Sequence, residues 1–398
     1  MKNYGHYVVV ISIAIIGSLL LFFSSAATPT SQFEVDSGTI NPPATKITES
    51  TASGGSAVMF GSTAASGSNF NVVGSKIIDP LGKEFIPVGA NVNGPNSWWN
   101  GYTAGNASIA KDRWHWNVIR LKTCYDNTAC PLAGVRSTVN NDMDAIINDY
   151  TSKKIVVQIA LFQYTGGFPE GTELTKASNW WVNIANKYKD NPYVWFNLLN
   201  EPGDQPSTIP TWNSVTDTLS SAIRNTGAKN IIVDDGTSWG QEVYRGWDCV
   251  TSISPADSGI LSKGSDLAIK HKNMIFNVHV YGWWGGGNCP DSTRDQLISW
   301  YFGQTKSRNL SVHVGELQGA SNLQYDYTPG TTAAARAFFR KAPELRIGLL
   351  YWHGNGGSTW TSDLVDVSNP EWYKINSTAS NLSEWGQLLR NYSLQVNP

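Results

Sequence analysis

Short apolar segments recur along the chain from about residue 70 onward. Eight of them have the length of β-strands and are rich in β-branched and aromatic residues. They comprise residues 84–90, 115–121, 154–161, 192–200, 229–235, 273–281, 310–316 and 346–352. Amphipathic, helix-like stretches lie between them, among them residues 143–153, 177–190 and 333–344.

Eight strands that alternate with helices predict a (β/α)8 TIM barrel, a fold of the α/β class. A β-hairpin around a turn at residues 79–82 is expected before the first barrel strand. The alternative is an open, doubly wound sheet, which usually carries a GxGxxG phosphate loop after its first strand. The sequence has no such loop. We therefore expect one barrel domain over residues 70–398.

The first 27 residues differ from the rest of the chain. Residues 7–23 are mainly apolar, Lys2 precedes them, and small residues follow at 24–27. This pattern predicts a secretory signal peptide or an uncleaved N-terminal membrane anchor. Residues 28–69 are rich in Ser, Thr, Gly and Ala and predict a flexible linker. We expect an exported protein, either secreted or tethered to the membrane by its N-terminal segment.

Export changes the interpretation of the four cysteines, Cys124, Cys130, Cys249 and Cys289. In an oxidising compartment they can form two disulfides, in any of three pairings. We favour Cys124 with Cys130, which closes a small local loop, and Cys249 with Cys289. The chain has no CxxC motif and no histidine at zinc-ligand spacing from a cysteine, so we expect no metal.

Composition narrows the classes of partner. Charged residues make up only 15% of the 398 residues and the formal net charge is −2, which argues against nucleic acid as a partner. Aromatic residues make up 12%, with 17 tryptophans. Such a content is typical either of a tryptophan-rich core or of a surface that stacks on sugar rings.

Two glutamates are predicted at the C-terminal ends of barrel strands, where active sites of this fold lie. Glu201 follows the fourth strand, which Pro202 ends, and Glu316 ends the seventh. Three βα units separate them, so they should face each other across the barrel mouth. Two facing carboxyl groups predict glycoside hydrolysis, in which one is protonated and the other ionised.

The neighbours of these glutamates predict which is which. Arg120, His279 and Tyr281 lie on strands from which they can reach Glu316. A positive charge or hydrogen-bond donor nearby lowers the pKa of a carboxyl group. We therefore expect Glu316 to be ionised and Glu201 to be the acid/base.

Five motifs then carry a resemblance to a known family. They are VIRLKT around Arg120, FNLLNEP around Glu201, AIRNTGAKNIIVDDGTSWG on strand five, VHVYGWW around His279 and Tyr281, and VGELQG around Glu316. From about residue 70 onward the chain resembles glycoside hydrolase family 5, the endoglucanase and mannanase family of the clan A barrels. The resemblance implies a retaining, double-displacement mechanism without a cofactor or metal.

The resemblance also implies residue roles. Glu201 is the acid/base and Glu316 the nucleophile. Asn200 hydrogen-bonds the 2-hydroxyl of the sugar, and His279 lines the site. Trp352 is the platform under the sugar being cleaved, while Arg120 and Tyr281 hold the nucleophile.

Strand three departs from the family. Many family members carry a D-x-H pattern there, whereas this chain has Gln158, Ala160 and Gln163 in VVQIALFQY. We expect a differently built sugar subsite, with Gln163 as a contact. Further stacking candidates in βα loops are Trp98, Trp99, Trp239, Trp283 and Trp284. Core positions are expected for Trp180, Trp181 and Trp300.

The sequence thus predicts a monomeric, exported endo-β-1,4-glucanase that acts on β-linked polysaccharide. The altered strand three keeps an endo-β-1,4-mannanase or a mixed glucan/mannan hydrolase open. A protein of another class, a non-catalytic carbohydrate-binding barrel, is the remaining alternative. The presence of both glutamates argues against it, since a decayed enzyme usually loses one.

Overall fold

The computed structural model describes residues 45–48, 56–59, 69–92, 105–125, 141–286, 288–319, 330–354, 364 and 382–398. The chain divides into two units, residues 1–63 and residues 64–398. In the first unit, β1 (Thr45–Thr48) pairs antiparallel with β2 (Ser56–Met59). The predicted linker therefore contains strand structure. Both segments include β-branched residues, which favour extended backbone.

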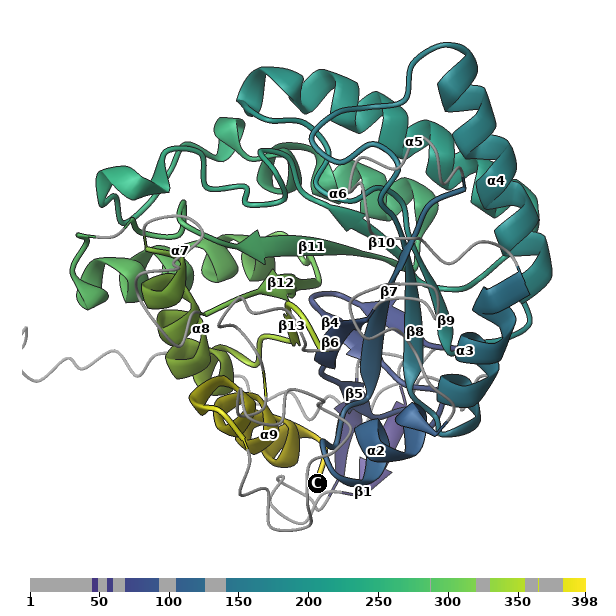
Figure 1. Cartoon of the computed structure of the whole chain (residues 1–398), viewed down its shortest axis with the longest axis horizontal. Coiled ribbons are helices and arrows are strands. Elements are labelled where there is room, and N and C mark those ends of the chain that lie inside the picture. Colours follow the sequence, from purple (N-terminus) through teal and green to yellow (C-terminus); the bar gives the residue numbers. More distant parts are fainter. Residues whose placement is uncertain are drawn as a thin grey trace, which may run out of the picture. The chain divides into compact units, whose positions relative to one another are not determined.

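In the second unit, eight parallel strands close into a barrel, which confirms the predicted fold (Figure 1). Each strand overlaps a predicted segment. The first predicted segment is divided, because Pro87 cannot donate a ladder hydrogen bond. The strands are β6 (Val88–Val92), β7 (Val118–Thr123), β8 (Val156–Leu161), β9 (Val194–Asn197), β10 (Ile232–Asp235), β11 (Met274–Val280), β12 (Val312–Leu317) and β13 (Leu349–Tyr351).

Helices surround the barrel strands (Figure 1). The large side chains of Trp181, Trp212, Trp284 and Trp385 are fully buried in the core that includes this helix layer. The helices are α2 (Asn106–Asp112), α3 (Asn141–Ser152), α4 (Thr172–Tyr188), α5 (Ile209–Asn225), α6 (Gly259–His271), α7 (Asp291–Ser307), α8 (Thr331–Leu345) and α9 (Glu384–Val396).

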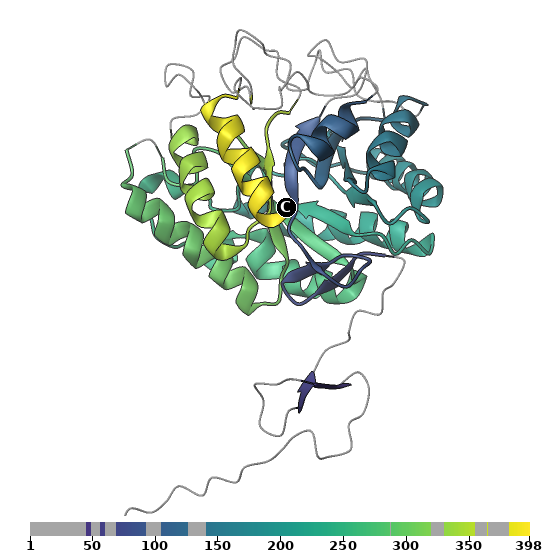
Figure 2. The ribbon, with the colours of Figure 1, turned by 90° about the horizontal axis from the view of Figure 1, so that it is seen from below.

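The predicted N-terminal hairpin is a three-stranded antiparallel sheet of β3 (Asn71–Val73), β4 (Lys76–Ile78) and β5 (Glu84–Phe85). It lies at the lower end of the barrel in Figure 2. Asn273, just before β11, holds it: its Nδ2 donates to Phe70 O at 2.8 Å and its Oδ1 accepts from Val72 N at 2.8 Å. The sheet thus covers the N-terminal ends of the barrel strands.

The structure confirms the predicted disulfide between Cys249 and Cys289, with an S–S distance of 2.05 Å. Cys124 is also disulfide-bonded, while its predicted partner Cys130 lies outside the described residues. The predicted signal or anchor segment, residues 1–27, lies outside them too. Among the helices that are described, none is long and apolar enough to cross a membrane.

Candidate active site

Glu316 lies on β12 as predicted, but Glu201 does not directly end its strand. β9 stops at Asn197, and Glu201 adopts φ = 49°, a left-handed conformation that costs a non-glycine residue about 1–3 kcal/mol. Two backbone hydrogen bonds fix this turn. Glu201 N donates to Asp235 Oδ2 at 3.1 Å, and Glu201 O accepts from Gly166 N at 2.9 Å. The turn therefore sets the direction of the Glu201 side chain.

Arg120 is the centre of a buried polar network. The strand predicted over residues 115–121 lies two residues further along, since β7 continues to Thr123, and Arg120 is buried within the barrel. Its Nη1 donates to Glu316 Oε1 at 2.7 Å, and its Nη2 donates to Asn200 Oδ1 at 2.8 Å and Asp235 Oδ2 at 2.9 Å. These bonds offset the burial of a cation, which otherwise costs several kcal/mol.

Asp235, at the end of β10, is a site residue that the sequence analysis did not single out. Its carboxylate accepts from Asn197 Nδ2 at 2.7 Å and Asn277 Nδ2 at 2.8 Å, and lies 3.1 Å from His279 Nε2. Burial opposes ionisation, but the charges of Arg120 and His279 outweigh it and lower the pKa of Asp235. Its position at the end of a predicted barrel strand was the signal from which the sequence analysis could have found it.

Glu316 is held by donors on both carboxylate oxygens. Arg120 bonds Oε1, and the Tyr281 hydroxyl donates to Oε2 at 2.7 Å. Burial and the negative charges of Glu316 and Glu201 raise the pKa of Tyr281 well above its usual value, so the phenol keeps its proton. The structure thus brings together the three groups predicted to form this contact.

Glu201 meets a histidine instead of a cluster of donors. His279 Nδ1 lies 2.8 Å from Glu201 Oε1 and 3.6 Å from Glu316 Oε2. Burial and the charge of Glu316 raise the pKa of Glu201, against the lowering effect of His279. Burial disfavours the imidazolium form of His279, but the carboxylates of Glu316 and Asp235 raise its pKa to about 10. The two glutamates therefore differ in their hydrogen-bond partners, and burial together with the charge of Glu316 favours the protonated form of Glu201.

Glu201, His279 and Glu316 each offer one atom that could bind a metal, a carboxylate oxygen or a ring nitrogen. These three atoms all lie within 4.8 Å of one another, a spacing that a metal ion could bridge. The sequence analysis placed these three residues in one site but did not consider them as metal ligands. A histidine protonated at neutral pH has no lone pair for a metal, however. The cluster therefore suits proton transfer better than metal binding.

Trp352, which follows β13, is partly exposed and stacks on Phe162 with ring centroids 6.2 Å apart. Lys122 Nζ lies 4.7 Å from the centre of the Trp352 ring. Burial lowers the pKa of Lys122 to about 7. The peptide bond from Trp352 to His353 is cis. Lys122, two residues beyond Arg120 on β7, was also missed by the sequence analysis.

The altered strand three is partly integrated into the network. Gln158 Nε2 donates to Asn197 Oδ1 at 3.0 Å, the same oxygen that accepts from Arg120 Nε at 2.7 Å. Gln163 is buried just beyond the end of β8. Its predicted contact with sugar remains a prediction.

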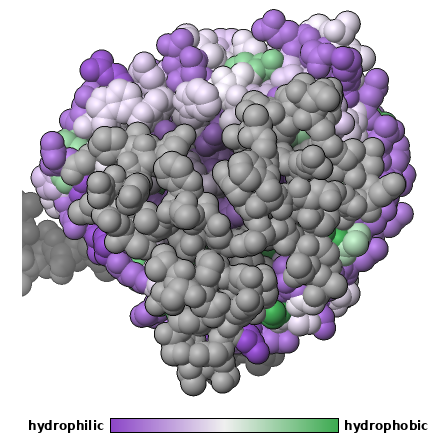
Figure 3. All heavy atoms as spheres, viewed as in Figure 1, coloured by the Kyte–Doolittle hydropathy of each residue, from purple (hydrophilic) through white to green (hydrophobic). Residues whose placement is uncertain are grey.

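The other predicted stacking residues divide by exposure. Trp239 is 40% exposed and Trp283 is partly exposed, whereas Trp284 is fully buried against Tyr301 and Phe338. Trp284 is therefore a core residue, and its prediction as a sugar contact is wrong. Trp98 and Trp99 lie outside the described residues. On the face seen in Figure 3, the described side chains around the rim are mostly hydrophilic.

The exposed fraction of the side chain also tests the three tryptophans that were predicted to lie in the core. Trp181 is fully buried, and Trp180 and Trp300 are partly exposed and pack against the core. All three lie in helices, as expected.

Known proteins share this sequence pattern and fold. A mannan endo-1,4-beta-mannosidase of Cellvibrio japonicus is 25% identical over 84% of this chain and 68% of its own length. The solved structure of a beta-glucanase from Saccharophagus degradans in complex with cellotetraose has a TM-score of 0.62 at 15% identity, covering 83% of this chain and 94% of that one. The catalytic domain of a mannanase from Streptomyces sp. SirexAA-E has a TM-score of 0.58 at 19% identity, covering 82% and 90%.

The two structural likenesses establish the fold alone. The family follows from the sequence, because the model of the cellulase family, glycosyl hydrolase family 5, matches residues 78–358. That match spans most of the chain and includes both glutamates, Arg120, His279 and Tyr281. The chain therefore belongs to glycosyl hydrolase family 5.

Proposed function

We propose that this protein is a retaining endo-β-1,4-glycanase that uses Glu316 as nucleophile and Glu201 as acid/base. The observation that carries the proposal is the spacing of these residues. One carboxylate oxygen of each lies within 4.8 Å of the other and of a ring nitrogen of His279. Retaining glycosidases have carboxyl groups about 5–5.5 Å apart, whereas inverting enzymes need about 6.5–9.5 Å to admit a water molecule. The short spacing supports direct attack by Glu316.

In the first step, the carboxylate of Glu316 attacks the anomeric carbon while protonated Glu201 gives its proton to the leaving oxygen. The bond between sugar and leaving chain breaks, and a glycosyl ester of Glu316 forms. Arg120 and Tyr281 bond the two oxygens of Glu316 and so fix its direction of attack. The raised pKa of Glu201 favours the protonated form that this step requires.

In the second step, ionised Glu201 takes a proton from water, which attacks the ester and releases the sugar. The His279 imidazolium, 2.8 Å from Glu201 Oε1, stabilises the carboxylate formed after the first step. Asn200 supports substrate binding in this scheme. Its Nδ2 donates one hydrogen to Thr165 Oγ1 at 3.1 Å, and we propose that the second is donated to the sugar 2-hydroxyl.

The substrate that the sequence motifs favour is β-1,4-glucan. β-1,4-Mannan is the second candidate, since the relative that matches 84% of the chain is a mannan endo-1,4-beta-mannosidase. The altered strand three, with Gln158 bonded inside the barrel, also favours a sugar subsite unlike that of many endoglucanases. The alternative of a non-catalytic binding protein gains no support from a site with both glutamates and their donors in place. Export of the enzyme is part of the proposal, supported by the N-terminal sequence and the Cys249–Cys289 disulfide.

The test is reducing-sugar release from a soluble cellulose derivative, mixed-linkage glucan, xyloglucan, glucomannan and galactomannan in parallel, with Glu316→Gln as the blank. Release from the glucans alone would support the endoglucanase, and release from the mannans would favour the second candidate. Proton NMR of the first product distinguishes retention from inversion. No release by a folded protein, or an inverted product, would overturn the proposal.

A further inference from the structure

The long loop between β10 and α6 presents two exposed tryptophans. Trp239 and Trp247 are 40% and 42% exposed, respectively, and both follow the strand that ends in Asp235. Trp239 is one of the predicted sugar contacts. Trp247 has no part in the site described above, and the exposure of so large an apolar side chain calls for a physical reason.

Trp247 belongs to a small aromatic cluster rather than standing alone. Its ring packs edge-on against Trp283, with centroids 5.1 Å apart, and against Tyr244 at 6.2 Å. Tyr244 and Trp283 also contact each other at 5.4 Å. The cluster supports the indole from behind while leaving part of it in solvent.

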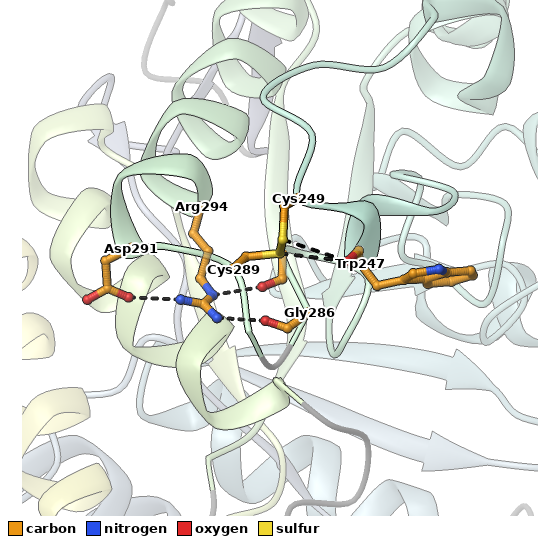
Figure 4. The surroundings of a disulfide bond; sticks show 7 residues. Trp247, Cys249, Gly286, Cys289, Asp291 and Arg294 are labelled. Carbon is orange, nitrogen blue, oxygen red and sulfur yellow. Dashed lines mark hydrogen bonds and ion pairs between the residues drawn. A yellow bond between two sulfur atoms is a disulfide. The ribbon is translucent and has the colours of Figure 1, made fainter.

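The backbone that carries Trp247 is held in place covalently. The Cys249–Cys289 disulfide joins this loop to the loop between β11 and α7 (Figure 4). Trp247 itself lies in a short 3₁₀ helix, Gly246–Asp248, between left-handed residues Arg245 (φ = 59°) and Cys249 (φ = 58°). In Figure 4 the indole extends away from the disulfide. The constraint therefore fixes the base of the side chain without covering its ring.

The two loops are also fitted closely to each other. A Cβ on Gly246 would lie 1.6 Å from Trp283 O, and one on Gly286 would lie 2.9 Å from Trp247 O. The second loop is in turn fixed by Arg294, whose Nη2 donates to Gly286 O at 2.6 Å (Figure 4). A rigid aromatic ring loses little conformational entropy when a ligand stacks on it.

The loop that carries Trp247 is connected to the acid/base side of the site. Trp239 N donates to Gly203 O, two residues after Glu201, at 2.8 Å. Further along, Gln241 Oε1 accepts from Trp283 N at 3.0 Å, which ties the aromatic cluster to the same loop. An acid/base protonates the leaving oxygen, so sugars that bind on its side belong to the leaving chain.

We propose that Trp247, supported by Tyr244 and Trp283, is a remote binding platform for a sugar ring of the leaving chain. The Cys249–Cys289 disulfide holds this platform in its binding geometry. The ligand class is a β-1,4-linked oligosaccharide long enough to extend past the first leaving-group subsites. The inference rests on the proposed endo-glycanase function and adds a determinant of its preference for long chains.

The test compares Trp247→Ala with the unchanged enzyme on substrates of increasing length. The substrates are a nitrophenyl β-disaccharide, whose aryl leaving group is too short to reach a remote platform, and the tetra-, penta- and hexasaccharides of glucose and mannose. Loss of one stacking contact should lower kcat/KM on the longest cleaved oligosaccharide by roughly threefold to tenfold. Activity on the aryl glycoside should stay unchanged, which also shows that the variant is folded. Trp247→Phe is the matched control and should restore part of the loss.

The disulfide is tested separately with the Cys249→Ser/Cys289→Ser double variant. If the disulfide holds the platform, this variant should show the same dependence on chain length as Trp247→Ala, with the aryl glycoside still cleaved. Equal kcat/KM for Trp247→Ala and the unchanged enzyme at every length would overturn the platform. If Trp247→Ala also loses activity on the aryl glycoside, and Trp247→Phe restores activity on that substrate alone, the role of Trp247 is structural instead. If the unchanged enzyme cleaves neither the aryl glycoside nor any oligosaccharide, the proposed function itself has failed.

Discussion

The imidazole of His279 bonds the carboxyl group of Glu201 through Nδ1, at 2.8 Å, while its other nitrogen lies 3.1 Å from the Asp235 carboxylate. Burial lowers the pKa of His279, but the charges of Glu316 and Asp235 and these two contacts raise it to about 10, which favours the charged form of the ring. The positive charge then acts on Glu201 and opposes the raised pKa that burial and Glu316 impose. His279 therefore sets where along the pH scale Glu201 loses its proton.

This arrangement predicts the effect of His279→Gln on the pH profile. Activity should fall as pH rises through the pKa of Glu201, because the first step needs the protonated acid. Removing the imidazolium raises that pKa further, so the alkaline limb of kcat/KM should move to higher pH, while the maximal rate falls. Initial rates measured across pH give the limb. An alkaline limb that moves to lower pH would contradict the assignment of His279 as the group that lowers the pKa of Glu201.

A second prediction concerns Asp235, whose neighbour in the sequence provides a matched control. Asp235→Asn leaves the buried charges of Arg120 and His279 less compensated, and breaking such a pair costs about 3–5 kcal/mol. Urea unfolding should show a loss of this order. Burial raises the pKa of Asp234 well above its usual value and so disfavours its charged form, so Asp234→Asn should cost much less. Similar losses for both variants would count against the network around Arg120.

A third prediction follows from Lys122. Burial, aided by the charge of Arg120 and opposed by Glu316, lowers its pKa to about 7, whereas an unfolded chain restores the ordinary value near 10.5. Between these values the unfolded state binds more protons at Lys122, so this residue should make the free energy of unfolding rise with pH by up to a few kcal/mol, against the opposite contribution of His279, whose pKa is raised. Lys122→Met should remove the Lys122 contribution alone, so the free energy of unfolding should change less favourably from pH 7 to pH 9 in the variant than in the unchanged protein. Urea unfolding at pH 7 and pH 9 measures it, and an unchanged pH dependence in the variant would contradict the lowered pKa.

The Cys249–Cys289 disulfide gives a fourth prediction, for stability. Its cysteines are 40 residues apart, and the chain-entropy model assigns about 4 kcal/mol to a loop of that length. The Cys249→Ser/Cys289→Ser variant should therefore lose up to about 4 kcal/mol of unfolding free energy in urea. Adding a reductant to the unchanged protein should also lower its free energy of unfolding. The same reductant added to Cys249→Ser/Cys289→Ser is the control, because it measures the effect of reducing any other disulfide. A double variant as stable as the parent would mean that native contacts alone fix these loops.

The barrel could be predicted because its strands are buried on both faces and read as continuous apolar runs. The positions of Arg120, Glu316, His279 and Tyr281 followed from those runs. The direction of Glu201 could not be predicted, since it depends on a left-handed turn fixed by Asp235 and Gly166, distant in the sequence. The local pattern of apolar and polar residues does not predict contacts between residues that are distant in the sequence.

The adjacent tryptophans show the same limit. Trp283 and Trp284 have almost identical local sequence, yet only Trp284 is fully buried, because Tyr301 on α7 and Phe338 on α8 receive its ring. Asp235 was missed for a related reason. Its partners come from β9 and β11, which flank β10, and from β7, which is not adjacent to β10 and reaches Asp235 only across the barrel interior.

Both described ends of the barrel unit lie at the face opposite the catalytic groups. Phe70 is bonded to Asn273 at the start of β11, and Asn397 Nδ2 donates to His115 O, before β7, at 3.0 Å. The glutamates lie at the other ends of the strands. A protein immobilised on a solid support through either of these ends would therefore keep Glu201 and Glu316 directed away from the support. Bulky polymers could then approach the two glutamates without interference from the attachment.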